Sequence, residues 1–332
     1  MTSHAAPASP PAPSPSPPSS PSLLSATPPG ARAYRLRTSR GEFAVVDVPP
    51  AGGGEPKGVV LSLPGFTGSK EDFTLVHGPL TARGYRSVAV DGRGQYESDG
   101  PVDDESVYAR AQLARDVLAQ AEALGTDVPL HLVGHSLGGQ IARAAVLEDH
   151  SPFRSLTLIS SGPARISVSQ EQRVKLLRDA LSRMTAAQCW EAILALGPPE
   201  EVGGPARGLG GQEHLRRRWL GTSPAQLLAT GRQLCAEPDL VAELAAVPMP
   251  FHVLSGAHDD TWPVPDLDAM AVRLNAHRTV VVGAGHSPAA ERPEATAHAL
   301  TTFWDGLQGH HNGTPTVTGT ATTSTTGAGP LA

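Results

Sequence analysis

The sequence predicts an α/β fold in which a mainly parallel central sheet is covered by helices on both faces. Short, uninterrupted apolar runs alternate along the chain with longer segments whose apolar residues recur at helical spacing. Such runs are typical of strands buried on both faces, and their alternation with helices is typical of parallel sheets. One long stretch, residues 163–247, breaks the alternation because it contains helical and loop-like sequence and no convincing strand.

The individual elements can be predicted in chain order. The expected strands are a hairpin at 34–38 and 43–48, followed by 58–63, 85–90, 129–133, 153–160, 250–254 and 279–282. The expected helices are 70–82, 107–124, 137–147, 267–274 and 291–307. This order predicts a core made of residues 31–162 and 248–308. Residues 163–247 are too long for a crossover and are expected to form an inserted helical cap over the carboxyl ends of the strands, where ligands bind in open α/β sheets. The alternative is a helical subdomain that serves only packing.

Composition excludes several classes of partner. With 332 residues, 39% of them hydrophobic, the chain is long enough to bury a substantial core. A net charge of -6 and the lack of a long basic run disfavour nucleic acid as a partner. The densest basic cluster, Arg216 to Arg218, is expected to be a solvated helix face. No apolar stretch approaches the roughly 18 residues that a membrane-spanning helix needs, so no membrane partner is expected.

The two ends of the chain and its cysteines indicate the compartment. Residues 1–30 are rich in Pro, Ser and Ala, residues 309–332 are rich in Thr and Gly, and both compositions predict disordered tails. The first tail lacks the charged and apolar regions of a secretory signal. Cys189 and Cys235, the only cysteines, make neither a disulfide framework nor a metal site. We therefore expect a cytoplasmic protein with reduced cysteines and no bound metal.

The segment 131–150 carries the candidate nucleophile. Here a short apolar run meets Gly-His-Ser-Leu-Gly and then becomes helical. A serine at the tip of a sharp strand-to-helix turn has a strained backbone, so the residues two before and two after it must be small. Gly134 and Gly138 satisfy that demand and make Ser136 the predicted nucleophile, although such a turn can also simply link a strand to a helix. The N–H of Leu137 lies at a helix N-terminus, which favours negative charge and predicts half of an oxyanion hole.

A serine hydroxyl needs a base, and that base needs a third group to orient it. His286 lies in a Gly-rich loop directly after the last predicted strand and before the final helix, and we predict it to be the base. The previous strand ends in two adjacent carboxylates. Asp259 has the better spacing from the preceding glycine and is the predicted acid, while Asp260 is expected to cap the following turn. The acid would accept the Nδ1 proton of His286 and leave Nε2 facing Ser136.

The second oxyanion donor is expected in the loop after the first parallel strand, within LSLPGFTGSKEDF. Gly65 allows the backbone to turn there, and the N–H of Phe66 can point at the developing oxyanion. Losing one such donor typically lowers the rate by roughly a hundred- to a thousandfold.

Together, the motifs GHSLGG, PGFTGS, DGRGQYES, GAHDDTWP and GAGH resemble those of the α/β-hydrolase superfamily, in its capped esterase- and lipase-like branch, over residues 31–308. The resemblance implies an α/β-hydrolase fold with an inserted helical cap. It also implies a serine hydrolase without a cofactor, in which the triad is Ser136, Asp259 and His286 and the amide donors are Phe66 and Leu137.

Two departures from the family pattern concern the substrate. Pro64 and Gly65 stand where many relatives have His-Gly, and Tyr96 replaces the second Gly of DxRGxGxS. Tyr96 is expected to narrow the mouth of the pocket. The candidate pocket residues are Tyr96, His135, Trp190, Trp219 and Trp262.

We expect acyl transfer through an acyl-Ser136 intermediate that water resolves. The expected substrate is a small carboxylic ester with an apolar part, because the cap supplies Leu, Ile, Met and Trp. The alternatives keep the fold and triad but perform other cofactor-free chemistry, as a haloperoxidase or perhydrolase, a C–C bond hydrolase, a thioesterase or an acyltransferase. A non-catalytic ligand-binding member of the family is a third class. No pattern in the sequence indicates an oligomeric state.

Overall fold

The computed structural model describes residues 28–196 and 207–308. Within this part of the chain, eight strands form one sheet in the order β1-β2-β4-β3-β5-β6-β7-β8. The strands are β1 (Arg32–Thr38), β2 (Gly41–Val48), β3 (Val59–Leu63), β4 (Arg86–Val90), β5 (Leu130–His135), β6 (Ser155–Ile159), β7 (Phe251–Gly256) and β8 (His277–Val281). β2 pairs antiparallel with β1 and β4, whereas the pairs from β4 through β8 are parallel. The predicted mainly parallel sheet is confirmed.

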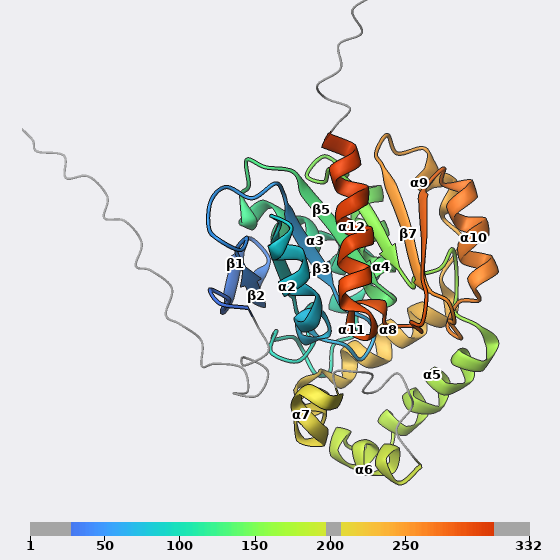
Figure 1. The fold of residues 1–332 in the computed structure, drawn as a ribbon. Helices are drawn as coiled ribbons and strands as arrows, with labels where there is room; N and C mark the ends of the chain where they lie inside the picture. Colours follow the sequence, from blue (N-terminus) through green and yellow to red (C-terminus); the bar gives the residue numbers. More distant parts are fainter. Residues whose placement is uncertain (1–27, 197–206, 309–332) are drawn as a thin grey trace, which may run out of the picture.

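Helices cover both faces of this sheet (Figure 1). The helices of the core are α2 (Thr74–Ala82), α3 (Arg110–Leu124), α4 (Leu137–Glu148), α10 (Val264–Arg273), α11 (Pro288–Glu291) and α12 (Pro293–Gln308), with 3-10 turns η1 (Lys70–Phe73) and η2 (Ser106–Tyr108) before α2 and α3. One hydrophobic cluster joins the sheet to α3, α4 and α10, and a second joins the opposite face to α2, α11 and α12.

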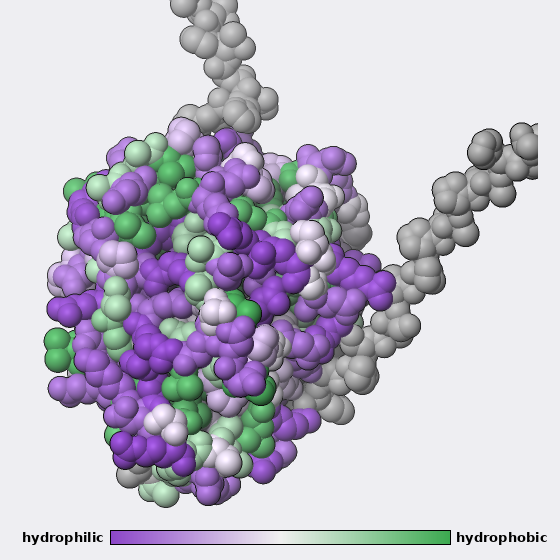
Figure 2. Space-filling model, turned by 180° about the vertical axis from the view of Figure 1, so that it is seen from behind, coloured by the Kyte–Doolittle hydropathy of each residue, from purple (hydrophilic) through white to green (hydrophobic). Residues whose placement is uncertain are grey.

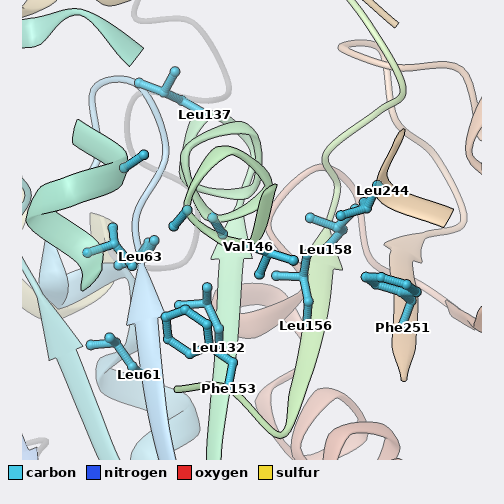
Figure 3. Packing of buried hydrophobic residues seen from close by; sticks show 14 of the residues in the cluster. Leu61, Leu63, Leu132, Leu137, Val146, Phe153, Leu156, Leu158, Leu244 and Phe251 are labelled. Carbon is cyan, nitrogen blue, oxygen red and sulfur yellow. The ribbon is translucent and has the colours of Figure 1, made fainter. Parts of the chain in front are cut away.

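Alternation along the strands divides the core between these two clusters. Leu61 of β3 and Leu132 of β5 belong to the cluster under α4, while their neighbours Val60 and Val133 belong to the other. Figure 3 shows Leu61 and Leu132 on the same side of the sheet as Val146 of α4. Because helices pack on both faces, the strands are held in place relative to one another. The loops at their carboxyl ends are therefore held together at one edge of the sheet.

The predicted elements are present, and their boundaries differ most near the C-terminus. The sequence predicted one helix from 291 to 307, but the structure has two, with Arg292 between α11 and α12 in a non-helical conformation (φ -139°, ψ 61°). Pro293 causes the break, because proline lacks an N–H and disfavours helical backbone in the residue before it. Likewise, α10 begins at Val264, three residues before the predicted 267, with a proline in its first turn.

Five helices lie between β6 and β7 among the described residues, and we call them the insert. They are α5 (Val168–Leu181), α6 (Ala186–Leu196), α7 (Arg207–Gly221), α8 (Pro224–Ala236) and α9 (Val241–Ala245). Residues of α5 to α8 share their own hydrophobic cluster, and Phe66, which follows β3, packs against it. The insert therefore lies at the carboxyl ends of the strands (Figure 1), and the predicted helical cap is confirmed. Residues 197–206 of the predicted cap, and nearly all of both predicted tails, lie outside the described residues.

The prediction that Arg216 to Arg218 form a solvated face is wrong for Arg218. Arg217 is exposed, but Arg218 is buried, and its Nη1 donates a hydrogen bond to Asp72 Oδ1 at 2.6 Å. Helical spacing explains the difference, because Arg218 lies one turn after His214 on the buried face of α7. One arginine of this cluster, Arg218, is therefore buried and joins the insert to η1 through Asp72.

The face of the molecule shown in Figure 2 is largely hydrophilic. Figure 2 shows hydrophobic residues scattered among hydrophilic ones on the face seen from behind. None of the described helices combines the length and apolar character needed to span a membrane. Cys189 and Cys235 are both free thiols.

A buried ion pair fastens the insert to α4. Arg143, 1% exposed, donates from Nη2 to Glu237 Oε1 at 2.5 Å and from Nη1 to the carbonyl oxygens of Gly162 (3.2 Å) and Pro163 (3.0 Å). Arg110 also pairs with Glu237. One guanidinium thus contacts the chain both just before α5 and just after α8.

Removing the carboxylate of this pair should destabilise the protein strongly. Glu237→Ala leaves the Arg143 charge buried without its partner, which typically costs about 3–5 kcal/mol. Urea unfolding of Glu237→Ala should show a loss of this size. Glu243→Ala removes an exposed glutamate from α9 and should change stability by less than about 0.5 kcal/mol. Equal stability of the two variants would contradict the structural role of the pair.

Candidate active site

Ser136 lies at a strained turn between β5 and α4. Its backbone has φ 53° and ψ -119°, a conformation that non-glycine residues rarely adopt. The Ser136 N–H donates to the carbonyl of Ile159 at 2.9 Å, and its carbonyl accepts from Gly139 N at 2.9 Å. The sheet on one side and the helix on the other hold the turn in place. Strain maintained in this way is typical of a nucleophile presented at a helix N-terminus.

The two glycines around Ser136 lie where no side chain fits. A Cβ on Gly134 would come within 2.4 Å of the Gly138 carbonyl oxygen, and a Cβ on Gly138 within 2.4 Å of the Leu63 carbonyl oxygen. The second contact also shows that the start of α4 lies against the end of β3. Consequently the loop after β3 begins beside the serine.

His286 and Asp259 come together from the ends of β8 and β7. His286 Nδ1 lies 3.0 Å from each carboxylate oxygen of Asp259. A Cβ on Gly256, at the end of β7, would come within 2.1 Å of the Gly285 carbonyl oxygen. Only glycine allows these two loops to approach so closely, and their approach brings the imidazole to the carboxylate.

The Asp259 side chain is fully buried and well supplied with donors. Besides His286, its Oδ1 accepts from the N–H groups of Thr261 (2.9 Å) and Trp262 (3.2 Å). Burial by itself raises the pKa of this carboxyl, but the hydrogen bond and charge of His286 and the two backbone donors outweigh it, so the pKa lies below its ordinary value. The ionised carboxylate can thus hold the Nδ1 proton of His286 and leave Nε2 as the basic nitrogen.

The two adjacent carboxylates, Asp259 and Asp260, have different surroundings in the structure. Asp260 is exposed, and its backbone carbonyl accepts a hydrogen bond from Ser167 Oγ at 2.7 Å. The expectation that the Asp260 side chain caps the following turn is wrong, because Asp259 accepts both turn amides while it contacts His286. One buried carboxylate therefore orders its own loop and orients the imidazole.

The two predicted amide donors flank Ser136. Leu137 is the first residue of α4, where N–H groups have no partner within the helix. The loop that carries Phe66 lies against the serine, since a Cβ on Gly65 would be 3.4 Å from Ser136 Cβ. Within residues 28–196 and 207–308, neither of these two N–H groups has a hydrogen-bond acceptor. Both remain available to a negatively charged oxygen.

His135 was predicted to line the pocket, and the structure places it between the loop that carries Phe66 and His286. Its Nε2 donates to the His286 carbonyl oxygen at 2.8 Å, and the two rings lie 5.1 Å apart. Burial and the positive charge of a protonated His286 lower the pKa of His135 to about 4. A neutral His135 therefore supports the backbone of His286.

Of two further candidate pocket residues, Trp262 borders the site, whereas Tyr96 lies where η1 meets α7. The Trp262 ring is stacked 6.3 Å from the His286 ring, and its Nε1 donates to the Ala164 carbonyl at 2.9 Å. The Tyr96 ring lies 4.8 Å from Lys70 Nζ and meets His214 of α7 edge to face. Tyr96, in the loop after β4, thus lies between η1 and the insert.

Trp190 and Trp219 lie within the hydrophobic cluster of the insert, 2% and 5% exposed. Trp219 Nε1 donates to the Ala186 carbonyl oxygen at 2.7 Å, which joins α7 to α6. Packing accounts for both side chains, and a role in substrate contact stays a prediction.

Sequence reasoning missed the contacts of two polar side chains, Gln95 and Asp72, around the loop that carries Phe66. Gln95 donates from Nε2 to the Gly65 carbonyl oxygen at 2.9 Å. Asp72 accepts from Arg218 of the insert and, at 3.3 Å, from the N–H of Ser69. Gln95 lies inside the motif DGRGQYES, so the sequence placed it in the loop after a strand. The sequence did not indicate that its partner is the Gly65 carbonyl.

The site combines a serine at a strained turn, a histidine oriented by a buried carboxylate, and two open amides. These groups are the ones that acyl transfer through a serine ester requires. Among the described residues, no cluster of three or more His, Cys, Asp or Glu side chains is arranged to hold a metal ion.

Comparison with known proteins agrees with this architecture. Over 254 residues, the chain is 28% identical to a pimeloyl-acyl-carrier protein methyl ester esterase of Aeromonas hydrophila. The matched region covers 68% of this chain and 92% of that protein. A shorter match, 40% identical over 95 residues, joins 28% of the chain to 30% of a 2-hydroxy-6-oxo-6-phenylhexa-2,4-dienoate hydrolase of Burkholderia cepacia. Among solved structures, a thermophilic esterase from Thermogutta terrifontis superposes with a TM-score of 0.64 at 21% identity, covering 83% of this chain and 99% of that one.

The model of the alpha/beta hydrolase family matches residues 59–299, from the start of β3 into α12. This range includes Ser136, Asp259 and His286 together with the whole insert. With the sheet order, the insert and this match in agreement, the chain belongs to the alpha/beta hydrolase family.

Proposed function

We propose that the protein is a serine hydrolase that cleaves a small carboxylic ester through an acyl-Ser136 intermediate. The observation that carries the proposal is the buried Asp259 carboxylate on His286 Nδ1, at the edge of the sheet where Ser136 occupies its strained turn. A histidine fixed in this way is a general base, and the serine is the group that it activates.

The reaction proceeds in two acyl transfers. Ser136 Oγ attacks the ester carbonyl carbon while His286 Nε2 takes the hydroxyl proton, and the oxyanion accepts hydrogen bonds from the Phe66 and Leu137 amides. Collapse of the intermediate breaks the bond to the alkoxy group, which leaves as the alcohol with the proton from His286. Water then attacks the acyl-serine with the same base, releasing the carboxylic acid and restoring Ser136.

An ester with an apolar part suits the surroundings of the site. Phe66 packs against both the core cluster and the cluster of the insert, so the loop of the second amide donor is bordered by apolar side chains. The Aeromonas relative, which the chain matches over most of its length, is named for a methyl ester. The Burkholderia relative supports C–C bond hydrolysis as the second candidate, on a match that covers 30% of that protein.

A substrate panel distinguishes the two reactions. We expect p-nitrophenyl esters with short and medium acyl chains to be hydrolysed with a higher kcat/KM than 1,3-diketones or thioesters of the same chain length. Ser136→Ala provides the background rate for each compound. Faster cleavage of the diketones than of any ester would overturn the ester assignment in favour of C–C hydrolysis.

The pH profile tests the base. A catalytic histidine must be neutral to accept a proton, and the ordinary pKa of histidine is about 6.5, so kcat/KM should rise with pH through roughly 6 to 7. The pKa of Asp259 lies below its ordinary value, so its carboxylate stays ionised as the histidine gains a proton. His135, with a pKa of about 4, stays neutral in the same range. A flat profile from about pH 5 to 8, with folding verified by circular dichroism, would contradict the role of His286.

A further inference from the structure

We infer that Gln95 is a positioning residue that fixes the direction of the Phe66 N–H in the oxyanion hole. The inference rests on the proposed function and assigns a task to a side chain outside the triad. Gln95 follows β4, whereas Phe66 follows β3, so the contact joins two neighbouring loops at the carboxyl edge of the sheet.

The Gln95 side-chain amide is held at both ends. Nε2 donates to the Gly65 carbonyl oxygen at 2.9 Å, and Oε1 accepts from the Gly92 N–H at 3.0 Å. The side chain is buried, and its backbone is fixed by a 2.9 Å bond from its own N–H to the Gly92 carbonyl. An amide with both groups engaged has one orientation, with its N–H toward Gly65.

The geometry of the peptide bond transmits this contact. The Gly65 carbonyl and the Phe66 N–H belong to one planar peptide unit, which is trans because the described chain has no cis peptide bond. In a trans peptide the C=O and N–H point in opposite directions. Holding the carbonyl toward Gln95 therefore turns the N–H away from it and fixes the line along which it can donate. The unit lies beside the nucleophile, as the 3.4 Å approach of a Gly65 Cβ to Ser136 Cβ shows.

The residues of this loop cannot by themselves fix the orientation of the peptide unit between Gly65 and Phe66. Pro64 offers neither an N–H nor a polar side chain, and Gly65 has the freest backbone of any residue. Besides Gln95, the Gly65 carbonyl accepts only from Gly68 N, at 3.2 Å, among the described groups. An oxyanion hole works because its donors are oriented before the charge develops, and a misplacement of about 1 Å can cost about a hundredfold in rate.

Two substitutions isolate the donor. Gln95→Met keeps the length of the side chain but cannot donate to Gly65. Gln95→Glu keeps the shape and the acceptor for the Gly92 N–H, but its ionised carboxylate offers no proton to the carbonyl, so it serves if the methionine variant does not fold. For both variants we expect kcat for a p-nitrophenyl ester to fall about ten- to a hundredfold with KM within about threefold of wild type. The affinity for an alkyl trifluoromethyl ketone, which mimics the tetrahedral intermediate, should fall by the same factor as kcat/KM.

Gln120→Met is the matched control. Gln120 is also buried, but it lies on α3 outside the site, so its removal tests the general effect of losing a buried glutamine. We expect wild-type kcat and ketone affinity in this variant. A Gln95 variant that melts at a similar temperature to Gln120→Met and still loses kcat supports the positioning role.

The outcomes separate this inference from the proposed function. If wild type neither hydrolyses esters nor binds the ketone, the proposed function fails whatever Gln95 does. If wild type is active and both Gln95 variants keep wild-type kcat and ketone affinity, the positioning role is wrong. A rise in KM with unchanged kcat would also overturn it, because it would place Gln95 in substrate binding.

Discussion

Ser136→Ala is expected to lower kcat for a p-nitrophenyl ester by about 10⁴- to 10⁶-fold, because no other group can form the acyl intermediate in its place. The methyl group fits the space of the hydroxymethyl group, so the turn and the binding of substrate should be retained. The measurement is steady-state hydrolysis with enzyme concentration raised until the residual rate exceeds the buffer rate.

Ser155→Ala is the control for this substitution. Ser155 is a buried serine at the start of β6, at the opposite end of the strand from the site, and it contacts His131. We expect its kcat to remain near wild type. If Ser136→Ala kept kcat within tenfold of wild type, the nucleophile would have to be another group.

Asp259→Asn is expected to lower kcat by about 10⁴-fold. The buried carboxylate accepts the Nδ1 proton of His286, whereas an amide nitrogen at the same place would donate toward Nδ1 and favour the tautomer with its proton on Nε2. That tautomer cannot take a proton from Ser136. Steady-state hydrolysis at a pH above the acidic limb of the profile measures the effect.

Asp260→Asn is the matched control, because it makes the same chemical change one residue away on an exposed side chain. Its kcat should stay within about twofold of wild type, since exposed substitutions away from a site usually have small effects. A larger loss in Asp260→Asn than in Asp259→Asn would refute the assignment of the acid.

The fold could be predicted from the sequence because its signals are local. Each buried strand is a short apolar run, and the tight glycine contacts at Gly134, Gly138 and Gly256 lie in motifs whose spacing can be read directly. The division of the last helix at Arg292 was missed because apolar spacing continues across Pro293, so periodicity concealed a break that the proline imposes.

The polar contacts around the site were less predictable because their partners are distant in the chain. Gln95 and Gly65 are 30 residues apart, and Arg218 and Asp72 are 146 apart. No local pattern records which side chain meets which carbonyl or carboxylate once the loops converge. The Arg218 contact was also hidden by its neighbours, since three adjacent arginines indicate a solvated face unless the packing of α7 is known.

The choice between Asp259 and Asp260 shows that contacts between residues close in the chain are also hard to predict from the sequence. Both positions are aspartate, and they lie at nearly the same distance in sequence from Gly256. Which carboxylate turns inward depends on the turn itself, where the N–H groups of Thr261 and Trp262 both point at Asp259. Such amide donors become visible only when the backbone of the loop is known.

The most direct test of the acyl-serine mechanism is covalent labelling with a fluorophosphonate probe, followed by peptide mass spectrometry. We expect one adduct per chain on Ser136 in wild type, much slower labelling in His286→Ala, and none in Ser136→Ala. An adduct on another residue, or labelling that survives Ser136→Ala, would contradict the mechanism.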